Sequence, residues 1–370
     1  MTTLAGGALL AIVPATVLVI SGKLYSLQQQ GYVAVAVTVA LFTAQFAAAA
    51  IVESRLSSPR GSRRVKHPAW LLILALAAGA GIVVTGSNII AVCIGLPLLL
   101  ASLEVGRGVA IAERLDRREL VASISVGVGA LAGVGLAFLH VPWAMTPLVV
   151  AILVATLART WGVGGSPGSL EGNALKWILI DVAFVGAVFP VLNALILAHL
   201  GASSAVVFAA VSTISGLVGI PLGYLRMRLL KEHSPFDILL SSSTVLFAVL
   251  AIFAADFLHV FGIFFGAAWT GSATLLPLVL ACGWRAASLW STIPFAGLRR
   301  LGLVRRLTLL RVASVIFTFG LAVGAVELGS VAFVFGSLLA GEILQATLYE
   351  AHHRKATRQH FDEIHTEKNT

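Results

Sequence analysis

The chain has 370 residues, of which 58% are hydrophobic and 11% are charged, and its mean hydropathy is +0.98. A soluble domain carries about 25% charged residues, so these values exclude a soluble globular protein. The net charge of +9 would suit a nucleic-acid binder, but the basic residues fall in short clusters between apolar segments, as in membrane proteins. We therefore expect no nucleic-acid partner. The apolar runs are continuous rather than alternating, which predicts membrane-spanning helices.

Twelve apolar segments are long enough to cross the roughly 30 Å hydrocarbon core of a bilayer as helices. A stretch rich in glycine and proline, at 160–176, separates the first six from the last six, and this composition is typical of a loop. We therefore predict an all-α polytopic membrane protein with two six-helix lobes. The predicted parts of the chain are an N-terminal lobe (1–160), a Gly-rich cytoplasmic connector (161–175), a C-terminal lobe (176–350) and a cytoplasmic tail (351–370). The predicted spans are 4–22, 31–52, 68–86, 88–105, 121–139, 143–159, 176–199, 204–225, 236–258, 270–297, 304–325 and 329–349.

The lysine and arginine residues orient the predicted spans. All but two of the 25 fall in segments that twelve spans would place on one side of the membrane, and such clusters face the cytoplasm. We expect a multi-pass protein of the plasma membrane, the inner membrane of a bacterium, with both termini in the cytoplasm. The exceptions are Lys23 and Arg285. The cytoplasmic segment 107–119 suits either a helix on the membrane surface or a helix end with snorkelling side chains.

Cysteine and histidine give no sign of a metal or redox site. Cys93 and Cys282 each lie inside an apolar run, where free cysteine behaves as a small hydrophobic residue. The nine histidines form no zinc-protease motif. We therefore expect neither a metal nor a cofactor.

Three ionisable residues lie within predicted spans of the second half: Asp181, Arg285 and Glu342. Charged groups are costly in a bilayer, so each is a candidate functional residue. Arg285 is the first candidate for substrate binding, because guanidinium keeps its charge and offers a planar fork that matches phosphate oxygens. The alternative is a structural ion pair of Arg285 with Glu342 or Asp181. The neighbouring Trp284 suits either sugar stacking or a place in the interfacial aromatic belt.

Two prolines lie within matching helices of the two halves. Pro14 is in the first predicted span, and Pro190 is in the seventh. Proline removes one backbone hydrogen bond from a helix and permits a bend. Interrupted helices at matching places point to the binding region of a transporter, so we expect both helices to bend as the protein changes state. The alternative is a static kink.

Two stretches of the chain resemble Wzx-type polysaccharide flippases. The segment 24–42 is similar to the loop and second helix of that family, and it reads LYSLQQQGYVAVAVTVALF. The segment 264–333 is similar to its tenth to twelfth helices, and it reads FFGAAWTGSATLLPLVLACGWRAASLWSTIPFAGLRRLGLVRRLTLLRVASVIFTFGLAVGAVELGSVAF. The layout of the whole chain is also similar. The family belongs to the multidrug/oligosaccharidyl-lipid/polysaccharide (MOP) exporter superfamily, which includes the MATE transporters. The resemblance implies a V-shaped bundle whose central cavity opens to each side in turn.

The resemblance implies a membrane transporter, a flippase for a polyprenyl-pyrophosphate-linked oligosaccharide or polysaccharide precursor. Its partners would be this substrate, membrane lipids, and glycosyltransferases or polymerases of cell-envelope synthesis. The alternative is a MATE-like, cation-coupled exporter of small amphipathic compounds, in which Asp181 or Glu342 would exchange the cation. A membrane scaffold is a third hypothesis. A polyprenyl-phosphate glycosyltransferase does not fit, because the first outer loop carries no carboxylate, and we expect no enzymatic activity.

Overall fold

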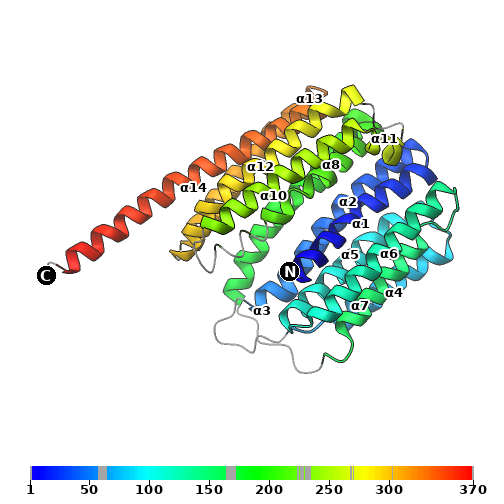
Figure 1. Cartoon of the computed structure of the whole chain (residues 1–370), viewed down its shortest axis with the longest axis horizontal. Coiled ribbons are helices and arrows are strands. Elements are labelled where there is room, and N and C mark those ends of the chain that lie inside the picture. The colour runs from blue at the N-terminus through cyan, green and yellow to red at the C-terminus, as the bar shows by residue number, and fades with distance from the viewer. Residues whose placement is uncertain are drawn as a thin grey trace. The chain divides into compact units, whose positions relative to one another are not determined.

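The computed structural model describes residues 2–56, 65–163, 172–222, 225, 229, 235–266, 269, 271–301 and 303–368. Every regular element in these residues is a helix (Figure 1). The elements are α1 (Thr2–Leu24), α2 (Leu27–Ala48), the π-helical turn η1 (Ala49–Glu53), α3 (Ser54–Leu56), α4 (Ala69–Val84), α5 (Ile89–Ala112), α6 (Asp116–Phe138), α7 (Thr146–Thr160), α8 (Gly172–Gly216), α10 (Pro235–Phe257), α11 (Val260–Phe265), α12 (Gly271–Arg300), α13 (Val304–Glu327) and α14 (Val331–Lys368).

Each predicted span overlaps a helix. α8 covers the seventh span and the first part of the eighth, and its backbone leaves helical values at Gly201 (φ 84°, ψ 177°), where the sequence predicts the loop between them. Among the described residues, seven helices are long and apolar enough to cross a membrane, and three apolar helices are shorter. The predicted all-α, polytopic fold class is confirmed.

Two compact units make up the chain. The first comprises Met1–Ile214 and His259–Gly271, and the second comprises Ser215–Leu258 and Ser272–Thr370. The first unit thus includes most of α8 as well as α11, which belong to the second half of the sequence. The predicted lobe boundaries at 160 and 176 stay a prediction, and most of the connector lies outside the described residues.

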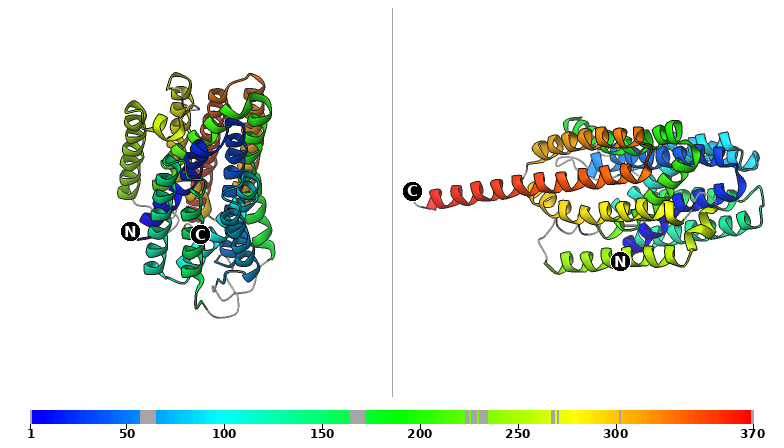
Figure 2. Two further views of the ribbon diagram at one scale, coloured as in Figure 1. Left: turned by 90° about the vertical axis from the view of Figure 1, so that its right-hand side faces the viewer. Right: turned by 90° about the horizontal axis from the view of Figure 1, so that it is seen from above.

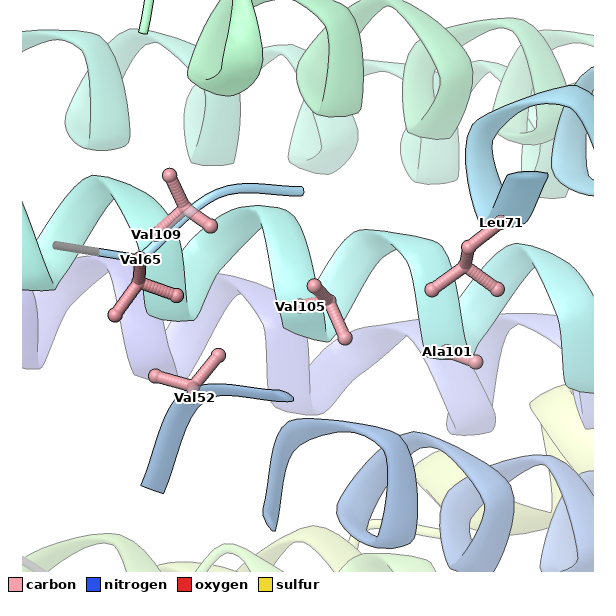
Figure 3. Close-up of a cluster of buried hydrophobic side chains, with 6 residues drawn as sticks. All are labelled: Val52, Val65, Leu71, Ala101, Val105 and Val109. Carbon is pink, nitrogen blue, oxygen red and sulfur yellow. The ribbon is translucent and has the colours of Figure 1, made fainter. Parts of the chain in front are cut away.

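In the first unit, α2 packs on α5, α1 packs on α6, and α7 contacts both α5 and α6. A cluster of buried side chains fastens η1 and the start of α4 to α5 (Figure 3). It consists of Val52, Val65, Leu71, Ala101, Val105 and Val109. Burying a side chain of this size contributes about 1.5–3 kcal/mol in water, whereas helices within a bilayer associate chiefly through the close packing that such clusters provide.

The short helix α11, which the sequence does not predict, packs on α1. The ring of Phe264 on α11 meets Phe138 of α6 edge to face, with centroids 6.1 Å apart. The ammonium group of Lys23 lies 4.6 Å from the centroid of Phe138. Lys23, one of the two basic residues outside the predicted cytoplasmic clusters, therefore has an aromatic partner, and such cation–π contacts are worth about 0.5–2 kcal/mol.

In the second unit, α13 packs on α14, and a buried cluster joins both to α12. Within this cluster the rings of Phe295 on α12 and Tyr349 on α14 lie 6.0 Å apart. α14 runs beyond the ends of α12 and α13, as both figures show (Figures 1 and 2).

The segment 107–119, which the sequence places in the cytoplasm, is two helix ends rather than a helix on the membrane surface. α5 continues to Ala112, the chain turns at Arg114 with φ 58°, and α6 begins at Asp116. Several predicted cytoplasmic arginines, at 60, 63, 64, 226 and 228, lie outside the described residues.

The orientation of the spans can be tested by thiol labelling in a variant whose native Cys93 and Cys282 are replaced. Ser203→Cys, at an exposed position next to the break in α8, should react with a membrane-impermeant maleimide in intact cells. Trp161→Cys, which replaces a side chain that is 75% exposed at the end of α7, should react only after permeabilisation. Labelling of Trp161→Cys in intact cells would contradict the cytoplasmic location of the connector.

Candidate functional site

The structure brings three of the four predicted substrate-binding residues into one unit. Arg285 and Trp284 lie on α12, and Glu342 lies on α14. Asp181 lies on α8 in the other unit, so its pairing with Arg285 stays a prediction.

Arg285 combines an aromatic and an anionic neighbour. Its guanidinium carbon lies 3.9 Å from the centroid of the Trp284 ring, and Glu342 is near enough to attract its charge. Ser291, which sequence reasoning missed, donates its hydroxyl to Oε1 of Glu342 and so fixes that carboxylate. Arginine is suited to such a place because its weakly hydrated plane stacks on an aromatic face and leaves its edge available for oxygen atoms.

Both predicted prolines lie inside helices. Pro14 is buried within α1, and Pro190 is buried within α8. The position with non-helical backbone angles in α8 is Gly201 rather than Pro190. The predicted role of the prolines in bending is therefore still a prediction.

Replacing either proline should distinguish a role in bending during transport from a role in stabilising the folded protein. Pro14→Ala and Pro190→Ala restore a backbone donor and remove little volume, so we expect the thermal stability of the purified protein to be kept. If the helices bend during transport, each variant should move cargo more slowly. Loss of folding in both variants would point to a static kink that the packing requires.

A second group of charged residues, which the sequence analysis did not identify, lies at the ends of α5, α6 and α7. Arg159 and Glu119 are 0% and 1% exposed, and Nε of Arg159 lies 2.6 Å from Oε2 of Glu119. Nη2 of Arg159 donates to Oε1 of Glu119 at 3.1 Å and to Oγ of Ser123 at 2.9 Å. Arg107 approaches the same carboxylate at 3.6 Å and bonds to Glu104 at 3.3 Å.

This network balances its charges, because two arginines face two glutamates. Arg159 and Glu119 are buried, whereas Arg107 and Glu104 are partly exposed. The network ties the ends of three helices together at the side where the sequence clusters its basic residues. The sequence places Arg159 beside the connector and Glu119 in a cytoplasmic segment. One feature of the sequence could have indicated this network: Glu119 and Ser123 form an i, i+4 polar pair at the start of a predicted span.

Removing one charge from this network should destabilise the protein strongly. Glu119→Gln leaves Arg159 buried without its counter-charge, and breaking a buried pair costs about 3–5 kcal/mol. The double variant Glu119→Leu with Arg159→Met should recover most of that loss. Thermal unfolding in detergent provides the measurement.

The matched control is the exposed pair of Glu350 and Arg354, whose atoms are also 2.6 Å apart and whose arginine is 72% exposed. Glu350→Gln should change the free energy of unfolding by about 1 kcal/mol or less. Equal effects of Glu119→Gln and Glu350→Gln would show that the buried network is not a stabilising element.

Two titratable groups outside the spans have shifted pKa values. Burial raises the pKa of Tyr25 to about 12, so its hydroxyl stays protonated and donates to the carbonyl of Ser87. Burial lowers the pKa of His67, whose ring nitrogens lie 3.0 Å from the carbonyl of Pro68 and 3.1 Å from the hydroxyl of Ser102. Tyr25 joins the loop before α2 to the loop before α5, and His67 joins the loop before α4 to α5 itself. In the described part of the chain, no three His, Cys, Asp or Glu residues gather in a possible metal site.

No family model and no curated protein matches the sequence. Solved structures do match it. One is the outward-facing conformation of a multidrug resistance MATE family transporter of the MOP superfamily, which is 12% identical, with a TM-score of 0.52 over 96% of this chain and 95% of that chain. Another, described only as "protein A", is 15% identical, with a TM-score of 0.57 over 96% of this chain and 93% of that chain. The chain therefore has a MATE-like fold.

Proposed function

We propose that the chain is a membrane transporter of the MOP superfamily, and within it a flippase for a polyprenyl-pyrophosphate-linked oligosaccharide. The fold supports the first part, because one of the similar structures is a multidrug resistance MATE family transporter of the MOP superfamily. The second part rests chiefly on Arg285. Its guanidinium lies within an apolar helix and is stacked on Trp284. A permanent cation in this setting attracts an anionic head group and repels a cationic drug.

The cargo would be held through two of its chemical parts. The guanidinium of Arg285 suits the pyrophosphate, and the adjacent indole of Trp284 suits a sugar face. Membrane lipids surround the protein, and glycosyltransferases or polymerases of envelope synthesis are the partners that would supply or consume the cargo. The protein would work in the plasma membrane by alternating access, with both termini in the cytoplasm.

A cation-coupled exporter is the second candidate function. The carboxylate of Glu342 favours it, because this group lies in an apolar helix and is fixed by Ser291. In such an exporter a bound cation and a drug would compete for the same carboxylate. The first half of the sequence supplies no predicted mid-span carboxylate, so this candidate depends on Glu342 or Asp181 alone.

Reconstitution with two probes would decide between these functions. Proteoliposomes would contain undecaprenyl-pyrophosphate N-acetylglucosamine, and an external galactosyltransferase would modify only the molecules that reach the outer leaflet. We expect protein-dependent modification of this glycolipid and no uptake of ethidium driven by a sodium or proton gradient. Gradient-driven ethidium movement without glycolipid flipping would favour the exporter, and movement of neither probe would contradict the transporter assignment for both classes.

Substitutions at Arg285 should separate phosphate recognition from ion pairing. Arg285→Ala should abolish glycolipid flipping, and Arg285→Lys should restore only part of it, because lysine lacks the planar fork. Arg299→Ala is the matched control, since Arg299 is an exposed arginine of α12 that also lies over an aromatic ring, 5.1 Å from the centroid of Phe295. It should keep both stability and flipping.

A double variant completes this test. If Arg285 only pairs with Glu342, Arg285→Met should lose about 3–5 kcal/mol of stability, and adding Glu342→Leu should recover most of it together with full activity. If Arg285 binds cargo, the double variant should be stable but inactive. A stable and fully active double variant would remove Arg285 from the binding site.

A further inference from the structure

One face of α8 packs against α2 within the first unit. Gly186, Asn193 and Leu197 lie on this face, because steps of seven and four residues return to the same side of a helix. A Cβ at Gly186 would stand 2.6 Å from the ring of Phe42 on α2, and a Cβ at Gly31 would stand 2.7 Å from Leu197. Residue numbers rise on α2 as they fall on α8, so the two helices run antiparallel in close contact and Asn193 lies between the two contacts.

Asn193 is a polar residue buried in this contact. It is 0% exposed, and neither its amide oxygen nor its amide nitrogen has a hydrogen-bond partner among the residues that the structure describes. On the facing side of α2, Thr38 shares the spacing of Gly31 and Phe42, but its hydroxyl donates to the carbonyl of Val35 at 2.8 Å. The contact therefore buries an amide without satisfying it, and leucine would fill the same place at a lower cost.

The neighbouring backbone gives α8 a means of relieving this cost. Pro190 lies one turn before Asn193 and lacks the amide hydrogen that the carbonyl of Gly186 would otherwise accept. A helix with a missing hydrogen bond bends at that point more easily than an intact one. The unsatisfied amide penalises the closed contact, and the weakened turn beside it allows α8 to part from α2.

We propose that Asn193 is a cargo-binding residue that this closed contact hides. When α2 and α8 separate, its amide donates to and accepts from a neutral, hydroxyl-bearing ligand, which in the proposed function is the sugar part of the glycolipid. An amide offers two donors and one acceptor group, which matches vicinal hydroxyl groups better than a phosphate, because an ionised phosphate cannot donate to the amide oxygen. This inference rests on the proposed function, and it places sugar recognition on α8, on a different residue from the phosphate site proposed at Arg285.

The first test replaces the amide by an apolar group with the same branching and the same number of heavy atoms. Asn193→Leu should raise the midpoint of thermal unfolding, because it removes an unsatisfied buried amide, and it should lower the rate of flipping of undecaprenyl-pyrophosphate N-acetylglucosamine at least tenfold. Ile196→Leu is the matched control, because Ile196 is another fully buried residue of α8, and it should leave both quantities near those of the wild type. An Asn193→Leu variant that is less stable than the wild type, or one that flips the probe at the wild-type rate, would overturn the proposal.

The second test needs no cargo and so stands apart from the proposed function. In a variant without native cysteines, Asn193→Cys should react with a hydrophilic maleimide at least ten times faster than Leu192→Cys, an equally buried neighbour. Equal rates would overturn the proposal, because the contact would then not open at Asn193. Faster labelling of Asn193→Cys in a protein whose wild type flips no glycolipid would uphold the opening of the contact and overturn the sugar assignment together with the proposed function.

Discussion

Backbone groups inside a bilayer have no water to bond, so each must find its partner within the protein. The described residues meet this constraint with helices throughout. Side chains obey it too. The hydroxyls of Ser21, Thr38 and Thr156 donate to carbonyls three or four residues earlier on their own helices. A hydroxyl that is satisfied in this way leaves its helix free to pack closely against a neighbour.

Longer polar side chains cannot be satisfied by their own helix, and they divide into two kinds. Glu119 and Arg159 pair through two hydrogen bonds and so link α6 to α7. Asn193 has no such partner among the described residues, whereas Arg285 stacks on Trp284 and is attracted by Glu342. The first kind stabilises the packing of the helices, whereas the second kind carries the binding roles proposed above for Asn193 and Arg285.

The sequence predicted the helices well because the thickness of the bilayer sets the length of an apolar run, and this length can be counted directly in the sequence. It also placed the loop at Gly201, since glycine and short polar residues mark the turn. It missed the pairing of Arg159 with Glu119, because both residues lie near span ends, where charge is normally solvated. It missed α11 because six residues in a loop carry too little periodicity. It missed Ser291 and Asn193 because their importance depends on what another helix places opposite them.

The length of α14 has a mechanical consequence. The helix has 38 residues and is therefore about 57 Å long, of which crossing the hydrocarbon core uses only about 30 Å. The remainder is an unbroken continuation of the same helical axis, and nothing in the described backbone interrupts it. A change of about ten degrees in the tilt of the embedded part would carry the far end sideways by about 5 Å. The position of the far end of α14 would therefore follow the inclination of the part that carries Glu342.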